Sequence, residues 1–358
     1  MSLTVPGDSR PLKVLFLPPS RQLAQAEKFV PGSAPDPNEF HNALAQEWIH
    51  ATTMEPFSWP INPFSGKHSL REWIDPVRAL NVLRDGRNFD LIVSVMEGAA
   101  LVPLALRRLA GMRAPIVLWD IGLTPGWRLR SAVLDFVVPR AEAIFVLSAS
   151  QKIYVKGRWP ITGTVELVSH RVDSSFFHPL PETLSNRVIS IGEDGGRDFE
   201  TLLAAAKRVS APFIVKTRLH QEKVLSAAIE NVTVLSDWLS FAELRKFYAD
   251  CAIVAVPLLP SINASGVTTI LEASAMGKAL VVTDSQSIRD FIIPDQTCLT
   301  VPSGDGEALA AAINRLLADP PLRRALGAKA RDFVQAEFSS RALAARVAPV
   351  MRRLARAG

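Results

Sequence analysis

The chain has 358 residues, enough for two domains of ordinary size, and 48% of them are hydrophobic, which excludes a largely disordered protein. Lys and Arg number 40 and Asp and Glu 35, a net charge of +5, and no dense basic block suggests an arm that binds nucleic acid. The two cysteines, Cys251 and Cys298, make neither a disulfide framework nor a metal-binding pattern.

The chain shows no signal-peptide pattern at its start and no apolar run long enough to span a membrane. We therefore expect a cytoplasmic protein. Peripheral association with the inner face of the membrane is the alternative, because the chain is mildly basic.

Buried strands recur through the N-terminal half, recognised by apolar runs that do not alternate with polar residues. They are predicted at residues 12–17, 89–95, 114–118, 142–148 and 165–168. An amphipathic helix is predicted over residues 38–52, with Phe40, Leu44 and Trp48 on its buried face. Strands that alternate with helices predict an α/β domain with a doubly wound parallel sheet.

Asp120 closely follows the predicted strand 114–118. Functional groups of open α/β sheets gather beyond the carboxyl ends of the strands, so we expect Asp120 to face a cleft. Its carboxylate could orient a hydroxyl group or take a proton from one. An aspartate that only caps a helix or fills a loop fits the pattern equally well.

A proline-rich joint at residues 179–185 separates the two halves of the chain. Beyond it, strands that again alternate with helices are predicted at residues 187–192, 213–217, 232–235, 252–256 and 279–283. We therefore predict one domain over residues 1–180 and a second over 181–340. A last amphipathic helix is predicted within residues 341–358.

The stretch 252–283 reads as strand, loop, helix and strand, which is a βαβ unit. Ser265 stands where an N-cap is expected. The free N–H groups of the next four residues converge at the helix start, where the helix dipole is positive. These residues are Gly266, Val267, Thr268 and Thr269. Such a ring of donors suits an anion such as a diphosphate.

Glu272 lies in one row with Ser265 and Thr268, because their spacing puts them on one helix face. Its carboxylate points toward the helix start but lies about two turns behind it. It can therefore accept hydrogen bonds from the hydroxyls of a sugar attached to the anion. The local pattern predicts a nucleotide site with ribose on Glu272, although many such helices bind nothing.

The segment GVTTILEASAMGKALVVTDSQSIRDFI resembles the C-terminal signature of retaining GT-B glycosyltransferases of the family 4 type, also called glycosyl transferases group 1. The similarity continues through DQTCLTVPSGDGEALAAAINRLLADPPLRRALGAKARDFV and fades in the N-terminal half. The resemblance implies two Rossmann-like domains facing a central cleft. It places a nucleotide sugar on the C-terminal domain and an acceptor on the N-terminal domain, with the helix in 341–358 crossing back to the latter.

The resemblance also implies roles around the nucleotide. The residue that matches Glu272 binds ribose in the family, and the backbone that matches Gly266, Val267 and Thr268 holds the diphosphate. After the glycine that corresponds to Gly192, relatives carry an arginine and then a lysine that neutralise the diphosphate.

Here Glu193 takes the arginine position and Arg197 lies at or beside the lysine position. Arg197 is therefore expected on the phosphates, with an ion pair to a neighbouring carboxylate as the alternative. Lys216 and Arg218, at the end of a predicted strand, are second candidates for the missing positive charge.

Trp238 and Leu239 correspond to the segment that holds the nucleotide base in the family.

Two other features depart from the family pattern. A second glutamate that relatives carry eight positions before Glu272 is Ala264 here, with Asn263 beside it, and a histidine of relatives is replaced near Asp120. The family's contacts to the transferred sugar therefore do not carry over directly.

We predict a glycosyltransferase of the hexosyltransferase type, with Asp120, Arg197 and Glu272 as its catalytic residues. The donor is expected to be a UDP- or GDP-sugar and the acceptor a glycan, a lipid-linked glycan or a small molecule. The resemblance implies retention of configuration and no metal or other cofactor. The alternatives are a GT-B sugar-nucleotide epimerase or hydrolase, and a catalytically weak scaffold partner in glycan assembly.

Overall fold

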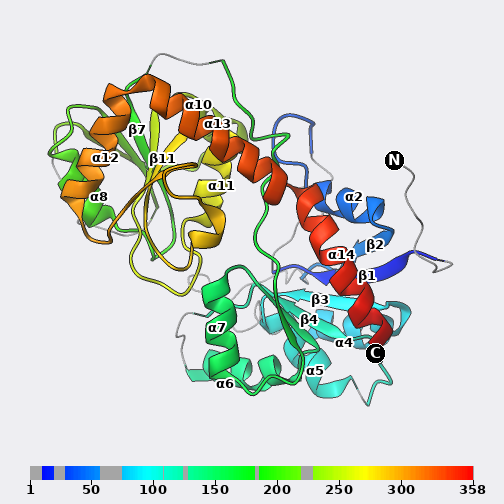
Figure 1. Ribbon diagram of the computed structural model, residues 1–358. Coiled ribbons are helices and arrows are strands. Elements are labelled where there is room, and N and C mark those ends of the chain that lie inside the picture. The colour runs from blue at the N-terminus through cyan, green and yellow to red at the C-terminus, as the bar shows by residue number, and fades with distance from the viewer. Residues whose placement is uncertain are drawn as a thin grey trace.

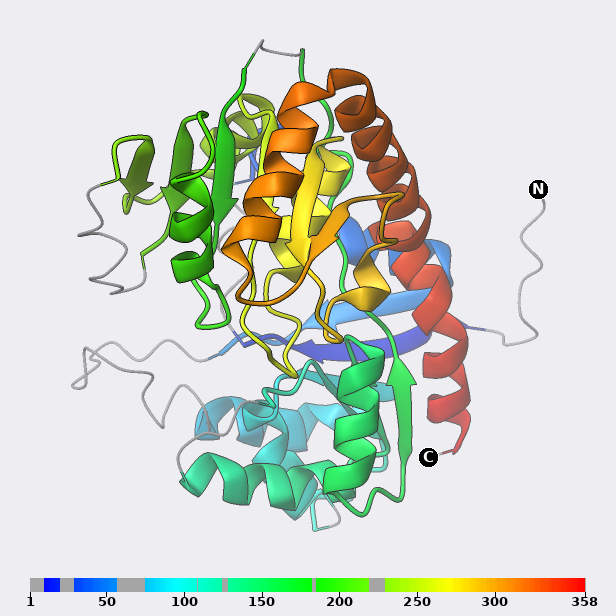
Figure 2. The same ribbon diagram turned by 60° about the vertical axis from the view of Figure 1, so that its left-hand side comes forward.

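The computed structural model describes residues 10–19, 29–56, 75–107, 109–123, 128–181, 185–218 and 229–357. Within these residues the strands form two six-stranded sheets, and neighbouring strands pair in parallel (Figures 1 and 2). Helices pack around both sheets, as the alternation of strands and helices predicts. The predicted α/β class with two doubly wound sheets is confirmed.

The first sheet has the strand order β2-β1-β3-β4-β5-β6. Its strands are β1 (Leu12–Leu17), β2 (Ile49–Thr53), β3 (Leu91–Val95), β4 (Ile116–Trp119), β5 (Ala143–Val146) and β6 (Thr164–Leu167). The α-helices of this half are α2 (Glu39–Gln46), α4 (Pro76–Asp85), α5 (Leu101–Leu106), α6 (Arg128–Val137) and α7 (Ala149–Arg158). Short 3₁₀ helices lie at Gly86–Asn88, Gly98–Ala100 and Val138–Arg140.

Both faces of this sheet are buried. In β1, Val14 and Phe16 enter one hydrophobic cluster, while Leu15 and Leu17 enter another on the opposite face. This explains the unbroken apolar run in the sequence. The strand order reverses between β1 and β3, so the loops after these strands open a crevice at the carboxyl edge of the sheet.

The predicted helix over residues 38–52 is wrong in its second half. α2 ends at Gln46, Trp48 has a left-handed backbone with φ of +58°, and the chain then forms β2 beside β1. Trp48 is 42% exposed rather than buried. The β-branched residues Ile49, Thr52 and Thr53 favour a strand, and this local preference outweighed the helical spacing of Phe40 and Leu44.

The second sheet has the strand order β12-β11-β10-β7-β8-β9. Its strands are β7 (Val188–Ile191), β8 (Phe213–Lys216), β9 (Val232–Leu235), β10 (Ile253–Val256), β11 (Ala279–Thr283) and β12 (Leu299–Val301). The helices of this half are α8 (Phe199–Ala206), α10 (Phe241–Ala249), α11 (Val267–Ala275), the 3₁₀ helix Arg289–Phe291, α12 (Gly306–Ala318) and α13 (Pro320–Glu337). The strand order reverses between β7 and β10, so their following loops share a crevice.

The last helix, α14 (Ser340–Ala357), packs against α2 of the first half. Figure 1 shows it continuing from α13 and running back over the N-terminal half. Leu343, Val347 and Leu354 are buried on its inner face. In the joint at residues 179–185, positions 182–184 lie outside the described residues.

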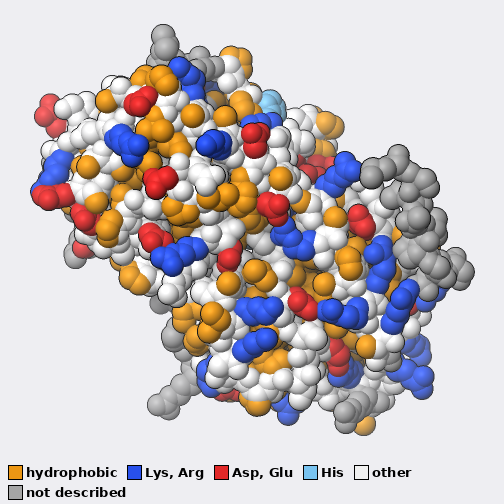
Figure 3. Space-filling model, in the orientation of Figure 1, with side chains coloured by type: hydrophobic (Ala, Val, Ile, Leu, Met, Phe, Trp, Pro, Cys, Tyr) orange, Lys and Arg blue, Asp and Glu red, His pale blue; other side chains and the backbone are white. Residues whose placement is uncertain are grey.

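Basic and acidic side chains are interspersed over the face in Figure 3, where more blue than red lies over the lower right, around the C-terminal end of α14. Two arginines of α14 form ion pairs, since Arg353 contacts Glu166 and Arg346 contacts Glu337. None of the helices in the described part of the chain is long and apolar enough to cross a membrane.

Candidate functional site

A cavity of about 1270 Å³ lies where residues of the two halves face each other. From the C-terminal half it is lined by the loops after β7, β9 and β10 and by the first turns of α11. From the N-terminal half it is lined by residues near the ends of β3, β4, β5 and β6, among them Met96, Asp120, Leu147 and His170. These loops lie at the carboxyl edges of the two sheets, where α/β folds bind ligands.

The helix α11 presents its N-terminus to this cavity. Its N-cap is Gly266, with φ of +81°, and not Ser265 as predicted. A Cβ at Gly266 would lie 3.0 Å from the side chains of Val256 and Leu258, so glycine suits both the backbone angle and the tight packing. Ser265 instead lies against Gly196 in the loop after β7, with its hydroxyl lining the loop rather than capping the helix.

The first amides of α11 are largely free. Within the described residues, the N–H groups of Gly266, Thr268 and Thr269 have no hydrogen-bond acceptor, and that of Val267 makes only a 3.3 Å bond to the carbonyl of Ala264. Thr268 is exposed and lines the cavity, as do its neighbours on either side. The four residues of the predicted ring of donors therefore all line the cavity, with Thr268 exposed and the other three largely buried.

Arg197 lies buried, 5% exposed, behind this helix start. Its Nε donates to Asp194 Oδ2 at 2.9 Å and its Nη2 donates to Thr269 Oγ1 at 2.9 Å. Its Nη1 is buried and has no hydrogen-bond partner among the described residues. A Cβ at Gly192 would lie 2.3 Å from Arg197 Nε, so the glycine makes room for the guanidinium.

The sequence allowed two roles for Arg197, a contact with phosphates or an ion pair with a neighbouring carboxylate, and the observed geometry is compatible with both. The arginine pairs with Asp194, and it also adds a positive charge to the helix N-terminus through Thr269. The unpartnered Nη1 lies beside Gly266, since a Cβ there would be 3.4 Å from it. A buried N–H donor without an acceptor destabilises the folded protein, so Nη1 of Arg197 is a candidate to donate to a bound anion.

Glu272 lies two turns along α11 and is half-buried. Its Oε2 accepts a hydrogen bond from the hydroxyl of Tyr248 at 2.8 Å. Burial raises the pKa of Glu272 to about 7, although the Tyr248 hydrogen bond and the charge of Arg197 act in the opposite direction. Further hydroxyl donors would favour the ionised form, so a sugar that binds here would also draw the proton off the carboxyl group.

Tyr248 was not predicted as part of the site. It is fully buried on α10, and burial followed by the negative charge of Glu272 raises its pKa well above the usual value. The two residues are 24 positions apart and on different helices, so no local spacing could have shown the contact.

The other predicted cations are already paired. Glu193 lies 3.3 Å from Lys216 Nζ and 3.0 Å from Arg218 Nε. The guanidinium of Arg218 stacks at 5.0 Å over the ring of Trp238, which is 70% exposed. Lys216 lines the cavity whereas Arg218 does not, and neither is free to neutralise a diphosphate unless Glu193 moves.

The predicted base-binding residues Trp238 and Leu239 both line the cavity, beyond the end of β9. The next residue, Ser240, caps α10 in a capping box, in which its hydroxyl accepts from Glu243 N–H and Glu243 accepts from Ser240 N–H. The capped helix fixes the position of the segment that precedes it.

Asp120 lies across the cavity at the end of β4, with a left-handed backbone of φ +56°. Its carboxyl group has no hydrogen-bond partner among the described residues, while its own N–H donates to Phe145 O at 3.1 Å. Burial, and then the negative charge of Glu97, raise the pKa of Asp120 to about 6. Met96, after the neighbouring strand β3, has the same unusual backbone with φ of +67°.

Glu97 was missed by the sequence analysis. It is fully buried, and its Oε2 accepts from the N–H of Gly122 at 3.2 Å, which holds the loop after β4. The strand-end rule that singled out Asp120 would also have found Glu97, two residues beyond β3.

A second cavity of about 380 Å³ continues from the first into the N-terminal half. Its walls include Phe16, Phe40 and Trp119 together with His41 and Arg171. Seven residues line both cavities, namely Pro35, Pro37, Asp120, Leu147, His170, Thr268 and Glu272. The two carboxyl groups predicted as catalytic thus lie where the cavities join, one from each half of the chain.

Clusters of three or more potential metal-ligating side chains are absent from the described part of the chain. The two cysteines are both buried and free.

Comparisons with known proteins agree with this arrangement. Residues 176–319 match the family model described as glycosyl transferases group 1. The chain is 24% identical over 240 residues to the lipopolysaccharide core biosynthesis mannosyltransferase LpcC of Rhizobium leguminosarum bv. viciae, an alignment that spans 59% of this chain and 64% of that protein. Both matches are to glycosyltransferases, and the chain spans less than two thirds of the length of this curated relative.

Solved structures show the same fold over nearly the whole chain. Sucrose-phosphate synthase from Thermosynechococcus elongatus aligns with a TM-score of 0.73 at 19% identity, covering 97% of this chain and 100% of that one. HepE from Anabaena, in complex with UDP and glucose, aligns with a TM-score of 0.69 at 17% identity, covering 96% and 100%. The GT-B fold predicted from the resemblance is confirmed.

Proposed function

From the geometry of the site and from these similarities, we propose that the chain transfers a sugar from a nucleoside diphosphate sugar to an acceptor held by its N-terminal half. The observation that carries the proposal is the helix start of α11. The free amides of Gly266, Thr268 and Thr269 begin a helix whose first turn lines a large cavity, and the buried, unpartnered Nη1 of Arg197 lies beside Gly266. These groups would bind the two phosphates, and Glu272 would accept hydrogen bonds from the ribose.

The neighbouring structures support a nucleotide sugar as the donor, because HepE was solved with UDP-glucose. The base would lie beside Trp238 and Leu239, which line the same cavity at the end of β9. Either a UDP- or a GDP-sugar is compatible with these contacts. The transferred sugar would then reach the junction between Asp120 and Glu272.

In the proposed reaction, the bond between the anomeric carbon and the oxygen of the β-phosphate breaks while the acceptor oxygen bonds to that carbon. The negative charge that grows on the leaving diphosphate is stabilised by the amides of α11 and by Arg197. The acceptor hydroxyl gives its proton to the carboxylate of Asp120. A pKa of about 6 leaves this carboxylate mostly ionised at neutral pH yet basic enough to accept a proton.

We propose retention of configuration, in line with the family resemblance, with the acceptor entering from the side of the leaving group. Protein groups supply the positive charge that the diphosphate needs, so the proposed mechanism requires no metal ion.

Thermal denaturation with UDP, GDP, UDP-glucose and GDP-mannose tests the donor site. A ligand at 100 times its Kd should stabilise the protein by about 2.7 kcal/mol, visible as a higher melting temperature. Release of free nucleotide from the stabilising sugar nucleotide would then show turnover. Binding without turnover in the presence of varied acceptors would favour a scaffold protein, and no stabilisation by any nucleotide would contradict the proposal.

A further inference from the structure

The second cavity has an unusual balance of charge. Arg171 is the one Lys or Arg side chain in its described wall, whereas three carboxyl groups line it. These are Asp120, Asp173 and Glu272. A cavity built for a phosphate or a carboxylate would be expected to offer more than one cation, as anion sites usually do.

The charge of Arg171 is also neutralised within the protein. Its Nη1 lies 3.5 Å from Glu39 Oε2 and donates to Ser340 Oγ at 3.1 Å, and its guanidinium lies 5.2 Å over the ring of Phe40. Ser340 in turn donates a hydrogen bond to Glu39. The nearby charge of Asp173 also acts on Arg171.

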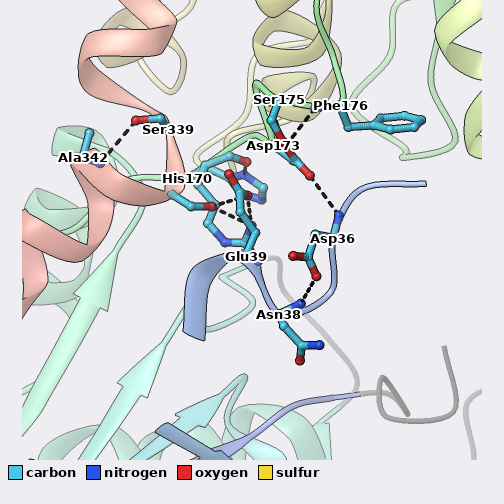
Figure 4. A network of polar contacts seen from close by, with 11 residues as sticks. Asp36, Asn38, Glu39, His170, Asp173, Ser175, Phe176, Ser339 and Ala342 are labelled. Atoms are coloured by element: carbon cyan, nitrogen blue, oxygen red, sulfur yellow. Dashed lines mark hydrogen bonds and ion pairs between the residues drawn. The ribbon is translucent and has the colours of Figure 1, made fainter. Parts of the chain in front are cut away.

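Figure 4 shows Glu39 of α2 and Asp173 of the segment after β6 on neighbouring elements, with Ser339, the residue before α14, contacting Ala342 beside them. Asp173 itself is buried and fully engaged, since it accepts from the N–H groups of Asp36, Ser175 and Phe176. The contacts around Arg171 are therefore formed within the folded protein, and Glu39, whose pKa burial raises to about 7, neutralises Arg171 once it is ionised.

The two histidines of the cavity add no positive charge. Burial, together with the nearby charge of Arg171, lowers the pKa of His41. Burial likewise lowers the pKa of His170, whose Nδ1 hydrogen-bonds to the carbonyl of Arg171 at 2.9 Å. Both rings are therefore neutral near pH 7, and the described wall is neutral to acidic.

We propose that the acceptor group which enters this cavity is an uncharged saccharide end, and that Glu39 sets this preference by neutralising Arg171. This inference rests on the proposed glycosyltransferase function. Sugar hydroxyls can donate to Asp120 and need no cation, whereas Glu272 is already assigned to the ribose of the donor. A phosphate or a uronic acid would lose its hydration and face these carboxylates without compensation. The volume of about 380 Å³ is near the lower end for small-molecule sites, which suits a short saccharide end.

Matched pairs of monosaccharides test the preference in the wild-type protein. The pairs are the methyl glycosides of glucose, galactose and mannose and the corresponding uronic acid glycosides, which differ only at C6. Binding is measured by titration with UDP or GDP present. The expected result is that a neutral member binds at least about tenfold more tightly than its acidic partner. Equal or tighter binding of the acids, or no binding of any neutral member, would overturn the inference.

Failure of the donor site would be seen separately, because stabilisation by UDP or GDP does not depend on the acceptor. A wild-type protein that binds a nucleotide but prefers acidic sugars would retain the proposed function and lose only this inference. A protein that binds no nucleotide would lose both.

The variant E39Q tests the role assigned to Glu39. Burial raises the pKa of Glu39 to about 7, so the comparison is made at pH 8, where its carboxylate is ionised. Glutamine is nearly isosteric and still accepts from Ser340, but it does not neutralise Arg171. Discrimination against the uronic acids should fall by about tenfold while binding of the neutral sugars stays the same. E166Q is the matched control, because Glu166 pairs with Arg353 away from the cavity. Discrimination that is unchanged in E39Q would exclude Glu39 as its cause.

Discussion

The two walls of the central cavity treat their ionisable groups differently. On the C-terminal wall, Arg197 is tied to Asp194 and Thr269, and Glu272 is tied to Tyr248. Lys216 is tied to Glu193. On the N-terminal wall, the carboxyl group of Asp120 has no hydrogen-bond partner among the described residues.

This difference fits two different tasks. A wall that binds a nucleoside diphosphate in every catalytic cycle binds it more tightly when its polar side chains are fixed in place before the ligand arrives. A carboxyl group that must accept a proton gains from an environment that keeps its pKa near the working pH. The same substitution of a charged side chain by a neutral one should therefore have opposite consequences on the two walls.

The largest effect is expected for R197M. This change removes the charge behind the helix start and the buried Nη1, so affinity for UDP or GDP should fall by about 100-fold, because hydrogen bonds to charged groups are each worth about 1.5–3 kcal/mol. Titration calorimetry measures it. R208M is the control, since Arg208 is exposed and pairs with the exposed Glu307. Unchanged affinity in R197M would leave Arg197 as a loop ion pair with Asp194 and no more.

Glu272 offers the next test, with two variants that separate binding from folding. Both E272A and E272Q should lose about tenfold in the preference for UDP over 2′-deoxy-UDP, or for GDP over 2′-deoxy-GDP, because the ribose loses its carboxylate acceptor. Only E272A leaves the buried Tyr248 hydroxyl without an acceptor, so it alone should lower the free energy of unfolding, by about 1–3 kcal/mol.

Urea denaturation and nucleotide titration measure the two effects independently. The variant Y248F is the companion control, since it removes the donor and leaves the ribose contact in place. If E272A and E272Q were equally stable, the hydrogen bond between Tyr248 and Glu272 would contribute little to folding. If both kept the ribose preference, the nucleotide would lie elsewhere in the cavity.

Replacing Asp120 by a neutral residue should raise the free energy of unfolding, whereas E272A should lower it. The pKa of Asp120 in the folded protein, about 6, is above the ordinary value of 3.8, so the folded state holds the proton more tightly than the unfolded state does. The stability that this proton provides is complete below pH 3.8 and is lost as the pH rises through 6. D120N stays neutral, so at pH 7 it should be more stable than the wild type by about 1–3 kcal/mol while turnover falls.

Urea denaturation at pH 5 and at pH 7 checks the sign of this prediction. The wild type should lose stability between these values, and D120N should lose less, because Glu39 and Glu272, whose pKa values burial raises to about 7, still titrate. D135N is the control, because Asp135 pairs with Arg158 and Trp159 far from the cavity. A D120N variant that is less stable at pH 7 would show that the carboxylate has a structural role.

The fold and the residues that line the C-terminal wall of the cavity were largely predictable because they depend on local patterns. Apolar runs marked the strands, and the residues from Ser265 to Glu272 marked one end of one helix. What escaped prediction depends on contacts between distant segments: Tyr248 beside Glu272, and Glu39 beside Arg171. The strand at Ile49–Thr53 escaped because a helical spacing and a β-branched preference overlapped in a few residues.

The smallest effect is expected for E193Q, which tests whether the C-terminal wall is fixed at its edge as well as at its centre. Glu193 is exposed and holds Lys216 and Arg218, so its loss should free positive charge and tighten binding of UDP or GDP by a few-fold, more at low salt. E307Q, at an exposed pair with Arg208, should change nothing. Weaker binding in E193Q would mean that Glu193 positions Lys216 for the phosphates. The glutamate that stands where relatives carry an arginine would then compensate for that arginine through Lys216.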